Sequence, residues 1–317
     1  MAIDDPRLAD YLDEWLARRR TQLRPTTLRG YRQTINCYVR PWLGGSRLSE
    51  LDRRGLERHY AMLLDRGGRA GRPLSPRTVQ LTHAVLHRAL KDALLDGLLE
   101  RNPAELARTP RRDPYATEAD ESLHVWTAAQ ARRFLDLVAD HPWRVLWHLA
   151  LGTGARRGEL LGLRWQDVDL DAARLTIRRS LSVVDGVPRL LATKTNRVRA
   201  VALGCSLVTE LERASALDRP PGRWDLVVAH PDGAHEDPLD VSGEFRRLVR
   251  ELDVPVIRVH DLRHTHASLL LEQGVPAKVV SERLGHTTIA MTMDIYAHLL
   301  PSMDREAAAQ LDRILMR

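Results

Sequence analysis

Four short segments in the second half of the chain gather arginine, lysine, histidine and tyrosine in a way that suits chemistry on a phosphate group. They are Thr153-Gly-Ala-Arg-Arg-Gly-Glu-Leu160, Ala192-Thr-Lys-Thr195, His260-Asp-Leu-Arg-His264 and Leu284-Gly-His-Thr287, and Tyr296 follows His286 by ten residues. Phosphoryl transfer is catalysed mainly by positioning and by stabilising negative charge. Arginine serves both needs, because its permanently charged planar fork matches phosphate oxygens. Arg156 and Arg263 are therefore candidate phosphate-binding residues, and an ordinary surface salt bridge is the alternative for either one alone.

His260 and Arg263 lie three residues apart, so a helix places both on one face, where they can reach the same phosphate. His264 follows His260 by four residues, a spacing that also suits two metal ligands. The zinc-binding pattern HExxH would need glutamate at position 261, where Asp261 stands, and no acidic third ligand follows. We therefore predict no metal ion and no cofactor, and interpret His264 and His266 as packing or supporting residues.

Tyr296 is the only one of six tyrosines that lies after residue 122. A lone tyrosine on a helix is more often a packing residue, but Ile295 and Leu299 can fill that role here. A hydroxyl with an ordinary pKa of about 10 needs a base or a strong cationic field before it attacks. Two arginines, together with His260 and His286, would supply both.

Lys194 and Glu159 are the two remaining candidates. The chain has 45 arginines but only three lysines, so arginine is the default at a basic position. Lysine can give a proton to a leaving oxygen, which arginine essentially cannot; the alternative for Lys194 is a solvated lysine at a hairpin turn. Glu159 stands one turn beyond Arg156. It either orients an arginine or a histidine through a charged hydrogen bond or is a plain helix-surface carboxylate.

The elements that must position these side chains are mostly helices, and 317 residues suffice for two domains. Helical spacing and Gly/Pro turns predict a four-helix bundle within residues 1–106. Its helices are expected over about 6–20, 26–40 and 49–65, and from 75 to the stop signal at 102–103. Residues 107–122, with dense charge and two prolines, are typical of a linker. Residues 123–317 are predicted to form a mostly helical domain with one small antiparallel sheet, whose hairpin turns at Asp185-Gly186.

Charge is uneven along the chain. Residues 1–110 carry 20 Lys and Arg against 13 Asp and Glu, a net of +7, and residues 111–317 carry 28 against 29, a net of −1. A basic bundle beside a neutral domain fits a module that grips nucleic acid, although a solvated basic face gives the same count. The groove-facing candidates are the helices Thr26–Arg40 and Arg77–Asp96. The candidate phosphate contacts are Arg24, Arg29, Arg32, Arg77 and Arg88.

Composition excludes several protein classes. Two cysteines, Cys37 and Cys205, are too few for a disulfide framework or a cysteine-built zinc site. No apolar run approaches the ~18 residues that span a bilayer, and the N-terminus lacks the apolar stretch of a signal peptide. We therefore expect a cytoplasmic protein without a membrane partner.

In this order and at these separations, after a basic helical bundle, the four segments and Tyr296 resemble the tyrosine recombinase (phage integrase) family of the lambda-integrase-like type. The resemblance covers nearly all of the second domain, and the bundle before it is similar to the family's SAM-like core-binding domain. It implies a site-specific recombinase whose tyrosine attacks a DNA backbone phosphate, forms a 3′-phosphotyrosyl link and expels a 5′-hydroxyl. Position by position, the family's catalytic residues are matched by Arg156, Lys194, His260, Arg263, His286 and Tyr296, with Glu159 as the supporting acidic residue.

The resemblance also implies partners. Two domains would enclose a double-stranded attachment site like a clamp, and four copies would assemble on two duplexes when a phage or mobile element integrates or leaves. Accessory directionality or DNA-bending proteins would assist, at the nucleoid of a bacterial host. The segment Pro301–Arg317 has the pattern of an amphipathic helix that docks on a neighbouring copy or on its own domain. The chain starts almost directly at the bundle, whereas many integrases of this family carry an arm-binding domain before it.

Three other functions stay open. A type IB topoisomerase-like strand transferase would use the same chemistry without strand exchange. A DNA-binding regulator would keep the site in vestigial form, and a metal-dependent nuclease would need clustered carboxylates that the sequence lacks. A covalent protein–DNA adduct separates the recombinase from the last two, and the joining of two duplexes separates it from the topoisomerase.

Overall fold

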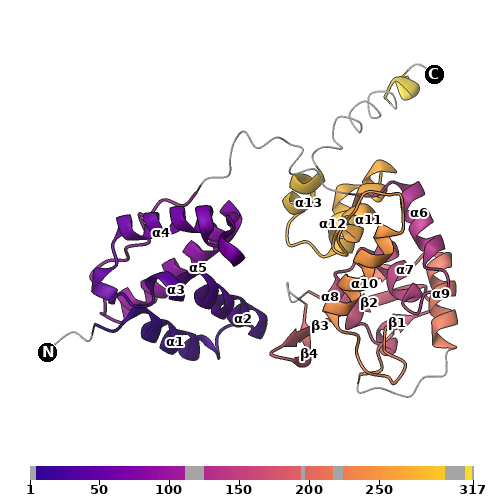
Figure 1. Cartoon of the computed structure of the whole chain (residues 1–317). Coiled ribbons are helices and arrows are strands. Elements are labelled where there is room, and N and C mark those ends of the chain that lie inside the picture. The colour runs from indigo at the N-terminus through magenta and orange to yellow at the C-terminus, as the bar shows by residue number, and fades with distance from the viewer. Residues whose placement is uncertain (1–4, 111–124, 194–196, 217–223, 297–310, 316–317) are drawn as a thin grey trace. The chain divides into compact units, whose positions relative to one another are not determined.

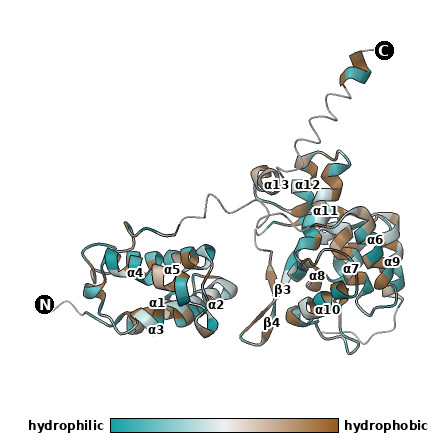
Figure 2. Ribbon diagram, turned by 45° about the horizontal axis from the view of Figure 1, so that its top comes forward, coloured by the Kyte–Doolittle hydropathy of each residue, from teal (hydrophilic) through white to brown (hydrophobic). Residues whose placement is uncertain are grey.

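The computed structural model describes residues 5–110, 125–193, 197–216, 224–296 and 311–315, with the backbone alone for Met291 and residues 294–296. The chain divides into two units, Met1–Glu121 and Ser122–Arg317, each with its own buried core (Figure 1). Apolar and polar residues occupy different sides of most helices in both units, as Figure 2 shows. Burial of these apolar sides is what holds each unit together.

Within residues 5–110, the first unit consists of helices with short 3-10 turns between them. Pro25 and Pro76 begin two of the helices, at positions where a missing N–H costs nothing. Asp52 and Ser75 cap helices by accepting hydrogen bonds from the N–H groups of the third helical residues. The helices are α1 (Leu8–Arg19), α2 (Pro25–Thr34), α3 (Arg40–Leu43), α4 (Arg53–Arg66) and α5 (Pro76–Leu95).

The helix predicted over residues 26–40 is not continuous, so that prediction is wrong. A π-helical turn, Ile35–Val39, separates α2 from α3, and the Arg40 N–H bonds the Ile35 carbonyl five residues back. The cause is Pro41, which has no N–H and whose ring would clash with the carbonyl four residues earlier in a regular α-helix. A wider turn before the proline relieves that clash.

The first unit also extends past the boundary predicted at residue 106. Ala107 is buried in its core. The Arg108 N–H donates to the Glu57 carboxylate at 2.9 Å, and the Gln80 side-chain amide donates to the Pro110 carbonyl at 2.9 Å. Residues 107–110 therefore pack on the bundle instead of beginning a linker.

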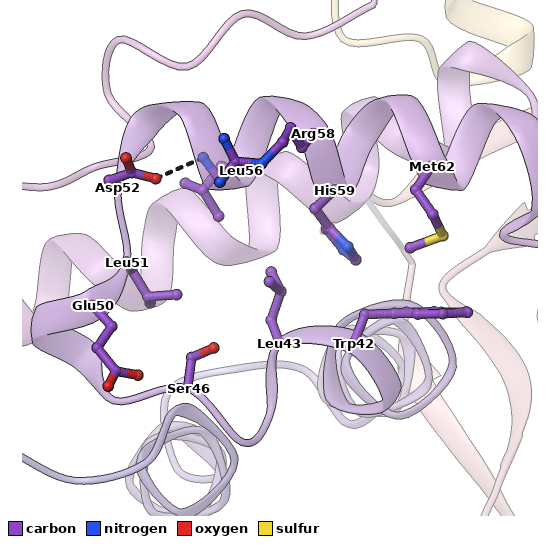
Figure 3. Close-up of a pocket in the computed structure, with 11 residues that line it drawn as sticks. Trp42, Leu43, Ser46, Glu50, Leu51, Asp52, Leu56, Arg58, His59 and Met62 are labelled. Carbon is purple, nitrogen blue, oxygen red and sulfur yellow. Dashed lines mark hydrogen bonds between the residues drawn. The ribbon is translucent and has the colours of Figure 1, made fainter.

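A cavity of about 360 Å³ lies beside α4 in the first unit. Figure 3 shows His59 pointing from α4 towards Leu43 and Trp42, with Met62 one turn further along. His59 is buried; neither ring nitrogen has a well-aligned hydrogen bond among the described residues, although the ring interacts with the backbone of Tyr38. Burial lowers the pKa of His59 to about 4, so the ring is neutral at physiological pH.

The predicted fold class of the second unit, mostly helical with little sheet, is confirmed. Its aromatic core gathers Trp126, Phe134, Trp147 and Phe245, whose ring centroids lie 5.1–5.9 Å apart in the contacting pairs. The helices are α6 (Ala128–Leu137), α7 (Arg144–Thr153), α8 (Arg157–Leu161), α9 (Cys205–Ser215), α10 (Pro238–Arg250), α11 (Asp261–Glu272), α12 (Ala277–Leu284) and α13 (Ile289–Tyr296). α12 contacts both α11 and α13 (Figure 1).

The strands form two sheets within the described residues, where one was predicted. β1 (Val168–Asp169), β2 (Arg174–Ile177) and β5 (Arg199–Ala202) make an antiparallel sheet in the order β1-β2-β5, with Leu175 opposite Val201. β3 (Arg179–Val184) and β4 (Val187–Ala192) form a separate hairpin. Its turn is at Asp185-Gly186, as predicted, and both residues have positive φ, as a tight hairpin turn requires.

The predicted helix over Pro301–Arg317 lies mostly outside the described residues. Residues 311–315 are helical and exposed. Within the part of the chain that the structure describes, no helix is both long and apolar enough to cross a membrane.

Candidate active site

The first motif places Arg156 at the start of a short helix. Gly154 closes α7 in the left-handed conformation, with φ 63°, and Arg156 is the N-cap of α8. A Cβ at position 154 would lie 2.6 Å from the His266 ring and 2.7 Å from Leu284, so only glycine fits. This close approach packs the turn against α11 and α12, the helices that lead to the other histidines and arginines.

Glu159 is buried between two arginines. It is 2% exposed; its carboxylate accepts from the Arg156 N–H and guanidinium, both at 3.0 Å, and from the Arg199 guanidinium at 2.6 and 3.2 Å. Burial alone raises the pKa of Glu159, but the hydrogen bonds and charges of Arg199 and Arg156 outweigh it and bring the pKa below its ordinary value. The residue is therefore not a plain surface carboxylate: it orients Arg156.

Arg263 joins the first motif to the last. It is 3% exposed on α11. One Nη donates to the Gly154 carbonyl at 2.7 Å and the other to the Leu284 carbonyl at 2.7 Å. The guanidinium thus bridges the turn before Arg156 and the turn before His286, which fixes where its positive charge sits.

His260 and His264 form a pair at the N-terminal end of α11. Their rings meet edge to face with centroids 5.3 Å apart. Partial desolvation, and then the nearby His264 and Arg263, lower the pKa of His260 to about 4, although the residue as a whole is exposed. Partial burial lowers the pKa of His264 as well. His260 is consequently neutral at pH 7 and able to accept a proton.

His266, in contrast, is a packing residue. Its Nδ1 lies 2.7 Å from the Leu151 carbonyl, and its Nε2 accepts from Arg283 at 3.2 Å. Arg283 also donates to the carbonyls of Gly152 and Ala202 at 2.8 and 2.9 Å. The His266 side chain therefore ties α11 to α7, and the Arg283 side chain ties α12 to α7 and β5.

His286 is placed by the left-handed residue Gly285, which ends α12 with φ 69°. It is 9% exposed, and its Nδ1 lies 2.7 Å from the Thr292 hydroxyl. Burial, and then the charges of Arg263 and Arg156, lower the pKa of His286 to about 4. The charges of Arg156 and Arg263 both act on the His286 ring. The segments 153–160, 260–264 and 284–287 therefore converge on one positively charged site.

Two of the predicted site residues cannot be placed in this convergence. Lys194 lies outside the described residues; the strands that flank it, β4 and β5, belong to different sheets, so the hairpin predicted around it is wrong. Tyr296 is the last residue of α13, and its side chain lies outside the description.

The five predicted phosphate contacts all lie on the surface of the first unit. Arg24 precedes α2, Arg29 and Arg32 lie on α2, and Arg77 and Arg88 lie on α5. Each is exposed. Their location suits a contact with a polyanion.

Sequence reasoning missed Arg199, Arg283 and Thr292. Nothing in the sequence distinguishes two arginines among 45, or Thr292 from the nearby Thr287 and Thr288. Their partners lie in other elements, so only the folded chain reveals them. Among the described residues, no three His, Cys, Asp or Glu side chains gather as metal ligands would.

Comparison with known families matches residues 125–303 to the phage integrase family and residues 7–62 to the N-terminal SAM-like domain of phage integrases. Among curated relatives, the chain is 25% identical to a tyrosine recombinase XerC-like protein of Caldanaerobacter subterraneus subsp. tengcongensis, over 98% of this chain and 84% of the relative. It is also 25% identical to the ICEBs1 integrase of Bacillus subtilis, over 92% of this chain and 79% of that one.

Solved structures share the fold. The Tn1549 transposon integrase in complex with a circular intermediate DNA superposes with a TM-score of 0.78 at 20% identity, covering 96% of this chain and 99% of that one. A lambda integrase in a tetramer bound to a Holliday junction gives 0.65 at 18% identity, covering 89% and 78%. At these identities the likeness establishes the fold alone.

Proposed function

The chain belongs to the phage integrase family, and from that membership we propose how its residues carry out the cutting and rejoining of DNA by a tyrosine recombinase. Its relatives include the ICEBs1 integrase and a putative prophage integrase of Mycobacterium tuberculosis. The protein is accordingly a site-specific recombinase of a mobile element. The roles of single residues, the DNA site and the assembly are the proposal.

The convergence of Arg156, Arg263 and His286 carries the proposal. Arg263 is locked to the turns on both sides, and both arginines act on the His286 ring. Positive charges fixed before the substrate arrives need no reorganisation when charge develops on a phosphate. A scissile phosphate held here would meet two arginine forks and two neutral histidines, His260 and His286.

The chemistry then needs no group beyond the chain. The Tyr296 hydroxyl attacks the phosphorus, its proton passes to a neutral histidine, and a 3′-phosphotyrosyl bond forms. The bond to the 5′-oxygen breaks as Lys194 protonates that oxygen. The same 5′-hydroxyl, or one from a second duplex, attacks the phosphotyrosyl bond and restores the DNA backbone.

The DNA partner follows from the first unit and from the relatives. Five exposed arginines on or before α2 and α5 would contact backbone phosphates of a double-stranded attachment site. By analogy with the lambda integrase tetramer on a Holliday junction, we assign a homotetramer on two duplexes. Accessory directionality or DNA-bending proteins would act with it, in the cytoplasm where the host chromosome lies.

A suicide substrate tests the proposal. A duplex from the element's own attachment site, nicked beside the scissile phosphate so that the released end diffuses away, should trap a detergent-stable protein–DNA adduct in EDTA. Tyr296→Phe should bind the duplex with nearly unchanged affinity and form no adduct. An adduct with Tyr296→Phe, or cleavage that appears only with added magnesium or manganese, would refute the assignment and favour a nuclease.

The same system separates the other rivals. A plasmid that carries both attachment sites should yield recombinant junctions, which are read by sequencing. Relaxation without junctions would indicate a topoisomerase-like enzyme, and binding without any adduct would indicate a regulator.

A further inference from the structure

Thr292 contacts His286 from the helix that ends at Tyr296. Its side chain is completely buried, and its Oγ1 lies 2.7 Å from His286 Nδ1. Thr292 lies within α13, one turn before Tyr296, whereas His286 belongs to the turn after α12. The hydrogen bond therefore forms only when α13 lies against α12.

The partner at Nδ1 decides what the other ring nitrogen can do. His286 is neutral at pH 7 because burial and the charges of Arg263 and Arg156 disfavour its protonation. A neutral imidazole has one N–H donor and one acceptor nitrogen. A backbone carbonyl at Nδ1 would hold the hydrogen there and leave Nε2 as an acceptor, which cannot bond a phosphate oxygen. A hydroxyl can donate to Nδ1 and so place the hydrogen on Nε2.

We propose that Thr292 is a positioning residue for DNA cleavage: its hydroxyl donates to Nδ1 of His286, fixes the tautomer whose Nε2–H points a donor at the scissile phosphate, and makes that orientation depend on the docking of α13. This inference rests on the proposed function. It links the nucleophile's helix to the charge-stabilising site, so the histidine takes its working orientation only when the tyrosine helix is in place.

A purely structural role for Thr292 predicts the opposite mutational order. Valine has nearly the same shape as threonine without the hydroxyl, so it would fill the same buried space. Serine keeps the hydroxyl but lacks the methyl group, so it would leave a small void. The positioning role predicts that Thr292→Ser keeps its cleavage rate and that Thr292→Val loses it.

The test is single-turnover cleavage of the suicide duplex by the full-length protein, in enzyme excess at pH 7.5. Thr292→Val should cleave about 10–100-fold more slowly, a loss of the size seen when a partner that orients a metal-bound imidazole is removed. Thr292→Ser should stay close to wild type. Gel-shift affinity and thermal unfolding of each variant report folding separately. Valine at the wild-type rate, or serine slower than valine, would overturn the inference.

Two further variants sharpen the result. Thr288→Val removes the hydroxyl of an exposed threonine just before α13, and it should leave the rate unchanged. In a His286→Ala background, Thr292→Val should cause no further loss, because the group that it positions is gone; an additive loss would contradict the inference. If the wild type itself forms no adduct, the proposed function fails and not only this step.

Discussion

Individual side chains of this site have two roles. The groups that would face a phosphate also hold the backbone in place. Arg263 bonds two carbonyls from separate motifs, and Glu159 bonds two arginines. Such buried charges are stable only because each is paired at good geometry. Losing one member of a pair should therefore affect folding as well as catalysis.

Glu159→Gln tests this at the carboxylate. The variant keeps the shape but leaves Arg156 and Arg199 without their counter-charge, so we expect unfolding free energy to fall by about 3 kcal/mol at pH 7. The folded-state pKa of Glu159 is depressed. Its stabilisation is thus complete above its unfolded pKa and is lost as pH falls through the lower folded pKa. The difference from wild type in urea titrations should shrink below about pH 4.5.

Glu251→Gln is the matched control for Glu159→Gln. Glu251 is an exposed carboxylate paired with Arg247 on α10. Exposed pairs contribute little, so this variant should change stability by less than about 1 kcal/mol. Equal stabilities for Glu159→Gln and wild type would show that the buried pair has no net effect.

Substitutions at Lys194 can distinguish a role as proton donor from a role as positive charge. If it protonates the leaving 5′-oxygen, Lys194→Arg should fail almost as badly as Lys194→Ala, by roughly 10²–10⁴ in single-turnover rate. A bridging 5′-phosphorothiolate has a leaving group that hardly needs a proton. On that substrate both variants should recover, while Tyr296→Phe should stay inactive.

The opposite result would assign Lys194 a different role. An active Lys194→Arg on normal DNA, or no rescue by sulfur, would make the lysine a phosphate or base contact. His260 would then be the next candidate for the general acid.

At the residue scale, the sequence identified groups that carry their own motif and missed those that act through a partner. Spacing predicts that His260 and Arg263 share one helical face, and the family resemblance adds Arg156 and His286. Arg199 does not, because its partner Glu159 is 40 residues away and on another element. Hydrogen-bond partners of this kind are set by tertiary approach, which local patterns do not encode.

At the scale of elements, the helices were predictable from the sequence. The interruption of one helix and the pairing of the strands were not. The apolar spacing of residues 26–40 continues through the π-turn, so only Pro41 signals it. Strand alternation identified β2, β4 and β5, but alternation does not select a strand's partner. That is why two sheets were predicted as one.

His59 in α4 gives a stability prediction at this scale. His59→Phe removes two buried nitrogens that lack a well-aligned hydrogen bond, at the loss of a contact with the Tyr38 backbone, and should raise the unfolding free energy of the first unit by about 1–2 kcal/mol at pH 7.5. Because the folded-state pKa is lowered to about 4, protonation below about pH 6.5 favours the unfolded chain. The gain should therefore grow as pH is lowered towards 5, as followed by thermal unfolding.

His141→Phe is the contrasting variant. Its Nε2 lies 2.9 Å from the Glu244 carboxylate and its Nδ1 accepts from the Trp143 N–H at 2.9 Å. Phenylalanine here leaves the Trp143 N–H without its partner and removes one bond to Glu244, which keeps its bonds to Arg247, and it should destabilise the second unit. A lower melting temperature for His59→Phe at both pH values would mean that the ring is better bonded than the structure indicates.

At the scale of the whole molecule, the two hydrophobic cores share no residues. The first core runs from Leu8 to Ala107, and the large core of the second unit runs from Trp126 to Leu262. We therefore expect fragments 1–121 and 122–317 each to unfold cooperatively alone. Each fragment's melting curve should coincide with one transition of the intact protein; a fragment without a cooperative transition would show that its core depends on the other unit.

The two-domain organisation and the basic first domain were predictable because composition and turn signals extend over many residues. The boundary was not, since residues 107–110 look like a linker yet pack on the bundle through two hydrogen bonds.

If the exposed arginines around α2 and α5 contact DNA phosphates as proposed, they also affect how fast the protein finds its target. Contacts with phosphates are the same at every position along DNA, so they give no preference for one sequence. They would hold the protein on non-target DNA long enough to slide, yet each added salt increment shortens that residence. The time to reach a distant attachment site should consequently pass through a minimum at intermediate ionic strength: below it, each visit to the wrong DNA lasts too long, and above it, each visit ends before much DNA has been scanned.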